Sequence, residues 1–281
     1  MSVSINTNAN AQFAAVAVKR ANEMMDEAML RLSTGKRLNS AKDDAAGIQV
    51  AIRMEKELNG INQALRNAND AQAVVDTAEG ALSEVHTLLL RMREIAVSAG
   101  SDTNTDADRA SLNTEVSALE TEIQRIGDQT TWGGIALFTG DFHKNSPIRF
   151  HLGPNTSNYI DVTLGCISIG TKDVQGSLSL TGAVDSRANA VSYITGIDVA
   201  ISIISSRRGA MGAVSNRLDS TIANLQNMSA NMVAAKGNVE DADYAMETAK
   251  LARAQILMQA ATAMLAQANA AKNSTLQLIT G

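Results

Sequence analysis

Residues 61–96 form the longest periodic segment of the sequence, INQALRNANDAQAVVDTAEGALSEVHTLLLRMREIA. Their apolar positions recur in alternating steps of three and four, the heptad pattern of a helix that buries one stripe against another helix. At about 1.5 Å per residue, this segment alone would be about 50 Å long. No proline interrupts it, and its one glycine, Gly80, leaves the pattern intact. The stripe consists of Ile61, Ala64, Ala68, Ala71, Val75, Ala78, Leu82, Val85, Leu89, Met92 and Ala96.

A helix of this length needs long partners, and the sequence contains candidates on both sides. After a turn at residues 100–105, a second stripe steps from Leu112 to Ile126, and we expect Gly127 to end that helix. A third long helix is predicted from Asp185 to about Asn238, with Arg208 and Ser215 as polar interruptions. These segments predict a helical bundle.

The two ends of the chain carry thinner apolar stripes. One helix is predicted from about Ala11 to a C-terminal cap at Gly35, and an alanine-rich helix occupies the last 40 or so residues. Such a pair buries little large apolar surface, so we expect it to be loose in a monomer and to order in an assembly.

Acidic residues mark two further helix starts. Ser40 is predicted to cap the long helix, with Asp43 and Asp44 complementing its positive end, and the acids at 240–243 suit the start of the last helix. Asp43 and Asp44 could also form an acid/base pair or bind metal. They lack a His, Cys or third carboxylate at useful spacing, so capping is the preferred interpretation.

Residues 130–182 differ in character from the rest. Glycines are frequent and both prolines, Pro147 and Pro154, lie here. Alternating runs at 148–152 and 159–164, separated by a turn, predict a β-hairpin too small to fold alone. The single cysteine, Cys166, excludes an intrachain disulfide, and we expect it to be a free thiol in a strand.

The order of elements is roughly palindromic, so the chain ends can meet when the chain doubles back at the β insert. The predicted fold is mainly α: a long helical coiled-coil or bundle rod with a small β-hairpin insert and paired N- and C-termini. Aromatic residues make up 3% of the 281 residues, against 45% apolar residues overall, which suits close helix packing.

Charge and hydropathy narrow the function. The net charge of −5 and the scattered basic pairs argue against a nucleic-acid partner. Residues 1–10 do not look like a signal peptide, and no run approaches 18 apolar residues, so no membrane partner is expected.

Nothing in the sequence suggests an enzyme. His86, His143 and His151 have no ligand cluster, and no phosphate loop or nucleophile elbow is present, so no catalytic residue, cofactor or metal is predicted. Composition alone would also permit a coiled-coil adaptor of the cytoplasm.

Six collinear blocks of the sequence resemble bacterial flagellin. The most distinctive is LSTGKRLNSAKDDAAG at 32–47, and the others are SINTN at 4–8, TAEGAL at 77–82, RMREIAV at 91–97, VEDADY at 239–244, and AQIL at 254–257 with LAQAN at 265–269. The family's architecture implies a terminal coiled-coil domain from residues 1–43 plus 242–281, and a rod domain from 44–241 with the β-rich insert at about 130–182. The chain looks like a minimal form with little or no outer domain.

The resemblance implies a structural subunit that is secreted, exported unfolded by the flagellar type III system and added at the distal tip of an extracellular filament serving motility. Its partner would be itself, in a helical homopolymer, together with an export chaperone, the filament cap and junction proteins. The alternative within the flagellum is a hook–filament junction protein. Residues expected to pack between subunits are Phe13, Val16, Met24, Leu32, Leu251, Leu257, Met264 and Leu265.

Departures from the family pattern are few. Residues 128–134 read DQTTWGG in place of the common NQTxFNG, and the chain ends LITG. Arg91, Glu94 and Ile95 lie in the block through which some flagellins contact an innate immune receptor, but Leu90 replaces a commonly polar residue there.

Overall fold

The computed structural model describes residues 7–139, 148–153, 157–165, 167, 178, 180 and 182–280, with side chains described as far as residue 271. Its contacts divide the chain into two compact units. The first unit comprises Met1–Glu57 and Asn231–Gly281, and the second comprises Leu58–Ala230.

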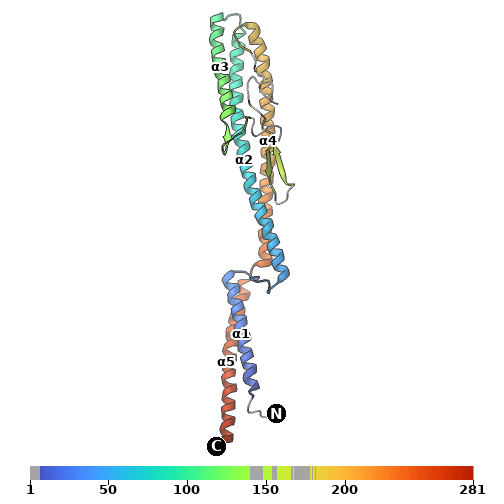
Figure 1. The fold of residues 1–281 in the computed structure, drawn as a ribbon, viewed down its shortest axis with the longest axis vertical. Coiled ribbons are helices and arrows are strands. Elements are labelled where there is room, and N and C mark those ends of the chain that lie inside the picture. Colours follow the sequence, from blue (N-terminus) through green and yellow to red (C-terminus); the bar gives the residue numbers. More distant parts are fainter. Residues whose placement is uncertain are drawn as a thin grey trace. The chain divides into compact units, whose positions relative to one another are not determined.

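Three helices run side by side in the second unit (Figure 1): parts of α2 (Ala45–Ala99) and α4 (Arg187–Glu240), and the whole of α3 (Asp106–Gln129). The heptad stripe predicted at 61–96 is buried, with every one of its members at most 2% exposed. The predicted mainly α fold, with long paired helices, is therefore confirmed. The largest fully buried side chains of the unit include Leu82, Leu89, Met92, Ile123, Leu137, Phe138, Ile197 and Ile204.

The turn between α2 and α3 is held by a buried arginine and a helix cap. The Arg109 guanidinium donates to the carbonyl oxygens of Ala99 (3.0 Å) and Ser101 (2.9 Å), which are free at the C-terminal end of α2. Thr105 and Asp108 form a reciprocal capping box at the start of α3. The two helices are therefore joined as a tight hairpin.

The polar interruptions of the α4 stripe have partners on α2. Arg208 donates twice to Glu79 Oε1, at 3.0 and 2.8 Å. Gln72 Nε2 donates to the Ser215 hydroxyl at 2.7 Å. These contacts fix the antiparallel pairing of α2 and α4 without breaking the apolar seam.

The second unit also contains two antiparallel hairpins. One pairs β1 (Thr131–Trp132) with β2 (Ile135–Ala136), and the positive φ angles of Gly133 and Gly134 form its two-residue turn. The other pairs β3 (Ile148–His151) with β4 (Tyr159–Val162), in the register Ile148 to Val162. The second hairpin was predicted, whereas the first was not. Cys166 and His143 lie outside the described residues.

Gly127 does not end α3, as the sequence suggested. The helix continues to Gln129, and Gly127 is buried where the backbone of Ile167 passes close by. A Cβ at residue 127 would lie 2.6 Å from the Ile167 carbonyl oxygen. The glycine therefore allows a close approach of two backbones.

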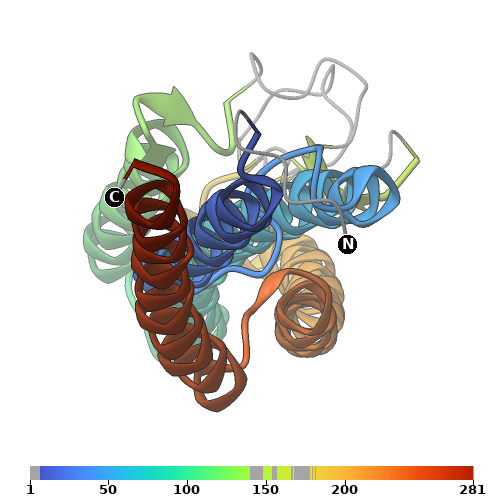
Figure 2. The same cartoon turned by 90° about the horizontal axis from the view of Figure 1, so that it is seen from below.

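In the first unit, α1 (Ala9–Thr34) and α5 (Tyr244–Thr280) lie side by side, as both views show (Figures 1 and 2). The two helices run antiparallel, because the Asn8 side chain reaches the carbonyl of Ala268 while Arg31 reaches Glu247. The buried apolar residues of the seam are small: Ala14, Ala21 and Ala28 on α1, and Ala254 and Ala261 on α5. The predicted pairing of the chain ends is confirmed.

The connectors of this unit form what we call the clasp, residues 35–37 with 239–242. Gly35 takes the left-handed conformation that caps α1, as predicted, and its carbonyl accepts from Ala242 N at 3.0 Å. Arg37 N donates to the Glu240 carbonyl at 2.7 Å, and Lys36 forms a β-bridge with Asp241. The two chain segments that flank the α1–α5 pair are thus tied together by backbone hydrogen bonds.

The predictions for two helix starts of this unit were right only in part. The α2 cap is Asp44, whose Oδ1 accepts from Ala46 N and Gly47 N at 3.0 Å, whereas Ser40 donates its amide to Asp43. At the other connector only Asp243 caps α5, by accepting from Ala245 N and Met246 N. Glu240 is instead the last residue of α4.

Among the helices that the structure describes, α4 alone contains an 18-residue window apolar enough to cross a membrane by length and composition. The buried residues of α4 recur along one stripe that includes Ile197, Ile204, Met211 and Leu218, and these belong to the same core as α2. Such packing is what a core helix of a bundle shows.

Candidate functional site

The first unit exposes large apolar side chains on both of its paired helices. Phe13 is 75% exposed, and Met264 is 64% exposed. Together with Asn10, Ala14, Gln267, Ala268 and Ala271, they line one depression of about 410 Å³ between α1 and α5. A depression with this apolar lining is a surface for another apolar group.

The depression is part of a longer apolar strip. Met24 lies eleven residues, or three turns, after Phe13, and therefore on the same face of α1. Leu257 and Met246 lie seven and eighteen residues before Met264, again on one face of α5. All three are exposed. We call Phe13, Met24, Met246, Leu257 and Met264 the apolar strip.

The predicted packing residues fall into two groups. Phe13, Val16, Met24, Leu257 and Met264 are exposed, and Val16 lies further round α1 than the strip. Leu32, Leu251 and Leu265 are half-buried, and their spacing places them in the seam between α1 and α5. The first group is free to contact another molecule, whereas the second already packs within the chain.

Sequence reasoning missed several exposed apolar residues of this unit. A heptad count that starts from Ala14, Ala21 and Ala28 separates the seam residues of α1 from its surface residues, and the same count on α5 identifies the exposed apolar residues there. The largest side chains of the sequence stripe do not follow this count. On α1 and α5 the missed residues are Met29, Leu30, Tyr244, Met246 and Ile256.

A buried ion pair lies within the seam. Glu247 is 4% exposed, and its Oε1 lies 3.4 Å from Arg31 Nη1 and 2.7 Å from Lys250 Nζ. Burial opposes ionisation of Glu247, but hydrogen bonds from Lys250 and Arg31 outweigh it and hold the pKa of this carboxyl below its ordinary value. The glutamate is therefore charged and paired inside an otherwise apolar seam.

The block expected from receptor-binding relatives lies in the second unit. Arg91 pairs with Glu115 on α3 at 2.8 Å and with Glu94 at 3.1 Å, and both of its partners are exposed. Ile95 is 3% exposed and belongs to the core. The surface of this block therefore combines charged side chains with the exposed Val97, and receptor recognition stays a prediction.

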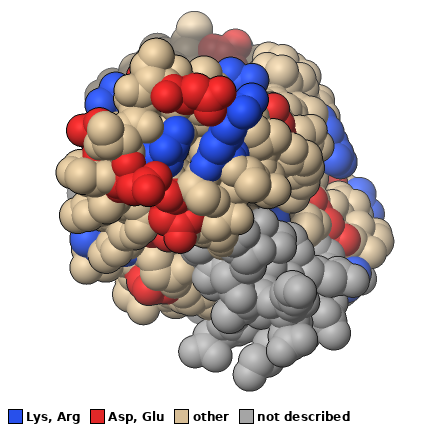
Figure 3. Space-filling view, turned by 90° about the horizontal axis from the view of Figure 1, so that it is seen from above, with Lys and Arg blue, Asp and Glu red and all other residues tan. Residues whose placement is uncertain are grey.

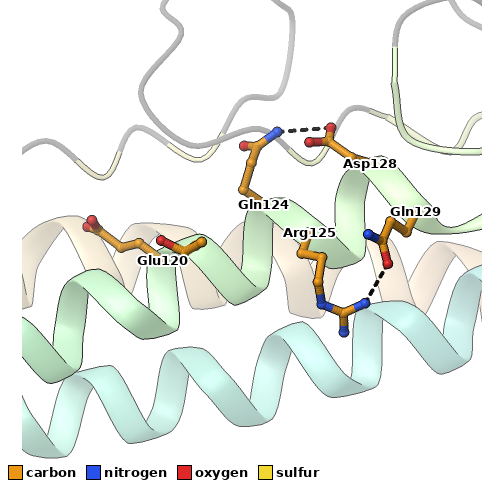
Figure 4. A pocket seen from close by; sticks show the side chains of 6 residues that line it. Glu120, Gln124, Arg125, Asp128 and Gln129 are labelled. Atoms are coloured by element: carbon orange, nitrogen blue, oxygen red, sulfur yellow. Dashed lines mark hydrogen bonds between the residues drawn. The ribbon is translucent and has the colours of Figure 1, made fainter.

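Another depression, of about 490 Å³, lies along one face of α3 (Figure 4). Its side chains pair with their own helical neighbours: Gln124 donates to Asp128 at 3.0 Å, and Arg125 to Gln129 at 2.7 Å. They do not converge on a common point as catalytic groups do. Nothing in this groove resembles an active site.

The placement of acidic, basic and histidine side chains bears on metal and nucleic-acid binding. Among the residues that the structure describes, no group of three or more His, Cys, Asp or Glu side chains could hold a metal ion. His151 Nδ1 lies 2.9 Å from the Asn158 carbonyl, within the β3–β4 hairpin. The face seen from above shows basic and acidic side chains interspersed rather than one basic patch (Figure 3).

Comparison with known proteins agrees with this geometry. Residues 5–143 match the bacterial flagellin N-terminal helical region, and residues 194–279 match the C-terminal helical region. A flagellin of Halalkalibacterium halodurans is 39% identical over 253 residues, covering 90% of this chain and 91% of the relative. A flagellin of Bacillus subtilis is 34% identical, covering 92% of this chain and 93% of the relative.

A solved structure from Vibrio parahaemolyticus, provisionally assigned as a flagellar hook-associated protein, shares the fold. It superposes with a TM-score of 0.59 at 17% identity, covering 71% of this chain and all of that one. Since flagellins of similar length align over nine-tenths of the chain, sequence similarity decides between the two classes. The chain belongs to the bacterial flagellin family, and it is a structural, non-enzymatic subunit of the extracellular flagellar filament.

Proposed function

We propose that the apolar strip is the surface through which neighbouring subunits pack in the filament. The observation that carries this proposal is that Phe13 and Met264 line the same depression. Phe13 is the most exposed large apolar residue of α1, and Met264 is 64% exposed, nearly as much as Tyr244 and Ile256 on α5. Covering such side chains on assembly is favourable by about 25 cal/mol for each Å² removed from water.

The predicted site residues take different roles under this proposal. Phe13, Val16, Met24, Leu257 and Met264 contact neighbouring subunits directly. Leu32, Leu251 and Leu265 hold α1 against α5, so that both helices present the strip together. Residues 1–43 plus 242–281 form the inner core of the filament, and residues 44–241 form the rod.

Contacts of this kind join different faces of identical subunits. A heterologous contact that does not close into a ring propagates as a helix, which suits an open-ended filament. The remaining partners are proposed from family resemblance: an export chaperone, the filament cap and junction proteins, with the subunit exported unfolded and added at the distal tip.

Single lysine substitutions test the strip. We expect Phe13→Lys and Met264→Lys each to abolish seeded polymerisation, because a charge on the strip would have to be buried between subunits. Gln12→Lys and Gln259→Lys are matched controls, since each adds the same side chain at an exposed polar position of the same helix. Electron microscopy of seeded samples measures filament length, and circular dichroism checks that the helices persist.

Long filaments from both strip variants would contradict the proposal. Equal loss in the strip variants and in the glutamine controls would also contradict it, because the strip would then have no special role. A copy number of about one ring for each filament, instead of thousands, would favour the junction-protein alternative.

A further inference from the structure

The seam between α1 and α5 repeats every seven residues with a small residue in each turn. Positions along the seam, all buried or half-buried, alternate in steps of three and four on both helices, with Asn22 and Arg31 half-buried beside them on α1. On α1 they are Ala11, Ala14, Val18, Ala21, Met25, Ala28 and Leu32, and on α5 they are Glu247, Leu251, Ala254, Met258, Ala261, Leu265 and Ala268. Except at Glu247, both sets are apolar.

Two contacts give the register of the antiparallel pair. Asn8 Nδ2 donates to the Ala268 carbonyl at 3.1 Å, and Arg31 Nη1 donates to Glu247 Oε1 at 3.4 Å. Counting equal numbers of residues along each helix from the Arg31 contact places Val18 next to the level of Ala261, whereas the count from the Asn8 contact places it level with Met258. By the count from the Arg31 contact, each level of the seam pairs one alanine with one larger side chain: Ala14 with Leu265, Ala21 with Met258, Met25 with Ala254, and Ala28 with Leu251.

This pattern fits more than one register. If α5 moved by one heptad, about 10.5 Å, Val18 would meet Ala254 or Ala268 in place of Ala261. Ala21 would meet Leu251 or Leu265 in place of Met258. Every level would again combine a small with a large side chain, so apolar packing distinguishes poorly among these registers.

Glu247 is the exception to the repeat. Only in the observed register does its buried carboxylate meet Arg31, whose guanidinium also pairs with Glu27 at 2.5 Å. Movement by one heptad would place Glu247 either near Met25 or beyond the last residue of α1. Glu247 would then keep only Lys250 of its own helix as a partner. Removing one of the two cations from a buried carboxylate is costly, whereas the same shift costs the apolar levels little.

We propose that the Arg31–Glu247 pair selects the register of α1 against α5, and that it contributes to specificity more than to stability. A single polar group in an apolar seam is known to fix register in this way. By fixing the register, the pair places Phe13 opposite Met264 and so assembles the apolar strip. That consequence for filament growth rests on the proposed function, but the choice of register does not.

The clasp also ties the two helices, so a test must leave it intact. We would replace the ion pair by apolar side chains, Arg31→Leu with Glu247→Leu, in the full chain. Removing both charges leaves no unpaired buried carboxylate, because Glu27, which also loses Arg31, is 54% exposed, so the pair of helices is expected to stay folded. The control, Lys19→Leu with Glu23→Leu, makes the same changes at an exposed pair on α1, whose side chains are 78% and 65% exposed.

Disulfide formation reports the register. In a Cys166→Ser background, Val18→Cys with Ala261→Cys reports the observed register, and Val18→Cys with Ala254→Cys or Ala268→Cys reports the two shifted ones. A disulfide needs Cα atoms within about 7 Å, so a shift of one heptad separates the reporters. Gel mobility distinguishes links within a chain from links between chains.

We expect the leucine pair to raise the ratio of shifted to observed links at least about tenfold, the effect of losing one charged hydrogen bond. The Lys19/Glu23 control should give the observed link alone, and so should Glu247→Gln, which can still accept from Arg31. Observed-register links alone in the leucine pair would overturn the proposal. Loss of all links would overturn it as well, because the ion pair would then be needed for pairing itself.

Seeded polymerisation of the same variants separates the two proposals. Shifted links together with lost filament growth would support both. Shifted links with normal filaments would support the register inference and overturn the apolar strip as the assembly surface. The failure of one proposal is therefore distinguishable from the failure of the other.

Discussion

Glycines within the helices of the second unit differ in whether a side chain would fit at their position. A Cβ at Gly80 or at Gly209 would meet no atom within 4 Å, and both residues are exposed. Since glycine is about 1 kcal/mol worse than alanine inside a helix, Gly80→Ala and Gly209→Ala should each raise the free energy of unfolding by about that amount. Urea denaturation followed by circular dichroism measures the change.

Gly127→Ala provides the contrasting substitution on α3. Its Cβ would lie 2.6 Å from the Ile167 carbonyl oxygen, so the same gain in helix propensity should be outweighed by a clash of about 1–3 kcal/mol. Equal effects at positions 80 and 127 would show that the close approach to Ile167 does not restrict the site.

Tyr193 has a buried side chain in the second unit, and its hydroxyl group has a hydrogen-bond partner on α3. It is 2% exposed, and its hydroxyl donates to Glu120 Oε1 at 2.5 Å. Burial raises the pKa of Tyr193, and the hydrogen bond to Glu120 raises it further, so the phenol stays protonated. Tyr193→Phe should lower the free energy of unfolding by about 1–2 kcal/mol.

Thermal and urea unfolding of this variant would measure the loss, and Tyr159→Phe is the matched control because Tyr159 is 46% exposed. An equal loss of unfolding free energy in the control would mean that the hydrogen bond to Glu120 does not stabilise the protein.

The sequence revealed the buried stripe at the residue scale, but not which terminal residues face inward. In 61–96 the large and small apolar residues occupy the same heptad positions, so one count finds them all. In α1 the seam is held by alanines, while Phe13 and Met24 lie outside it. Side-chain size was therefore a misleading guide, because close helix packing selects small residues.

The clasp is the element-scale feature whose strength should depend on pH. Lys36 Nζ lies 2.5 Å from Glu240 Oε1, and Lys236 Nζ lies 3.6 Å from Glu240 Oε2 and 3.4 Å from Glu55. The hydrogen bond from Lys36 lowers the pKa of Glu240, and burial opposes this only in part. The pKa of Lys36 is raised by the same hydrogen bond.

The sign of the effect follows from these directions. A lowered folded-state pKa means that Glu240 stabilises the clasp above its unfolded pKa of about 4.3, and that this contribution is lost as the pH falls. The raised pKa of Lys36 means that the stabilising contribution of this lysine is lost only at strongly alkaline pH. Because Lys36 is half exposed, we expect a contribution of about 1 kcal/mol.

Hydrogen exchange can read the clasp locally. The amides of Arg37 and Ala242, which donate to Glu240 O and Gly35 O, should lose protection between about pH 6 and pH 3. Glu240→Gln should remove this pH dependence, whereas Glu122→Gln, in an exposed pair on α3, should not alter it. Protection that stays constant over this range in the unsubstituted protein would refute the prediction.

Element boundaries followed from the sequence where the backbone alone sets them. Gly35 ends α1 because the left-handed conformation favours glycine, and the break between α2 and α3 was found at its turn. The errors arose where several groups compete. Ser40, Asp43 and Asp44 can all accept amide hydrogens, and the structure uses Asp44 for the helix and Asp43 for the preceding turn.

At the scale of the whole molecule, the mainly α fold with paired ends followed from the order of the periodic segments. What did not follow is the tertiary role of single residues. Gly127 looks like a helix end in the sequence, and only the distant backbone of Ile167 explains it. The ion pair of Arg31 with Glu247 likewise joins residues 216 positions apart, a separation that helical periodicity does not specify.

Truncation tests whether core folding depends on the second unit and polymerisation on the first. The large hydrophobic core runs from Ala68 to Leu218 and draws all its buried residues from the second unit. Deleting residues 1–34, or residues 244–281, should therefore leave α3 and the core-forming parts of α2 and α4 folded, since no buried core side chain is lost. Each deletion removes one side of the apolar strip, so it should abolish polymerisation. Cooperative urea unfolding and seeded electron microscopy measure the two properties. Filaments grown from either truncated chain would refute the assignment of assembly to the chain ends, and loss of cooperative unfolding would refute the independence of the core.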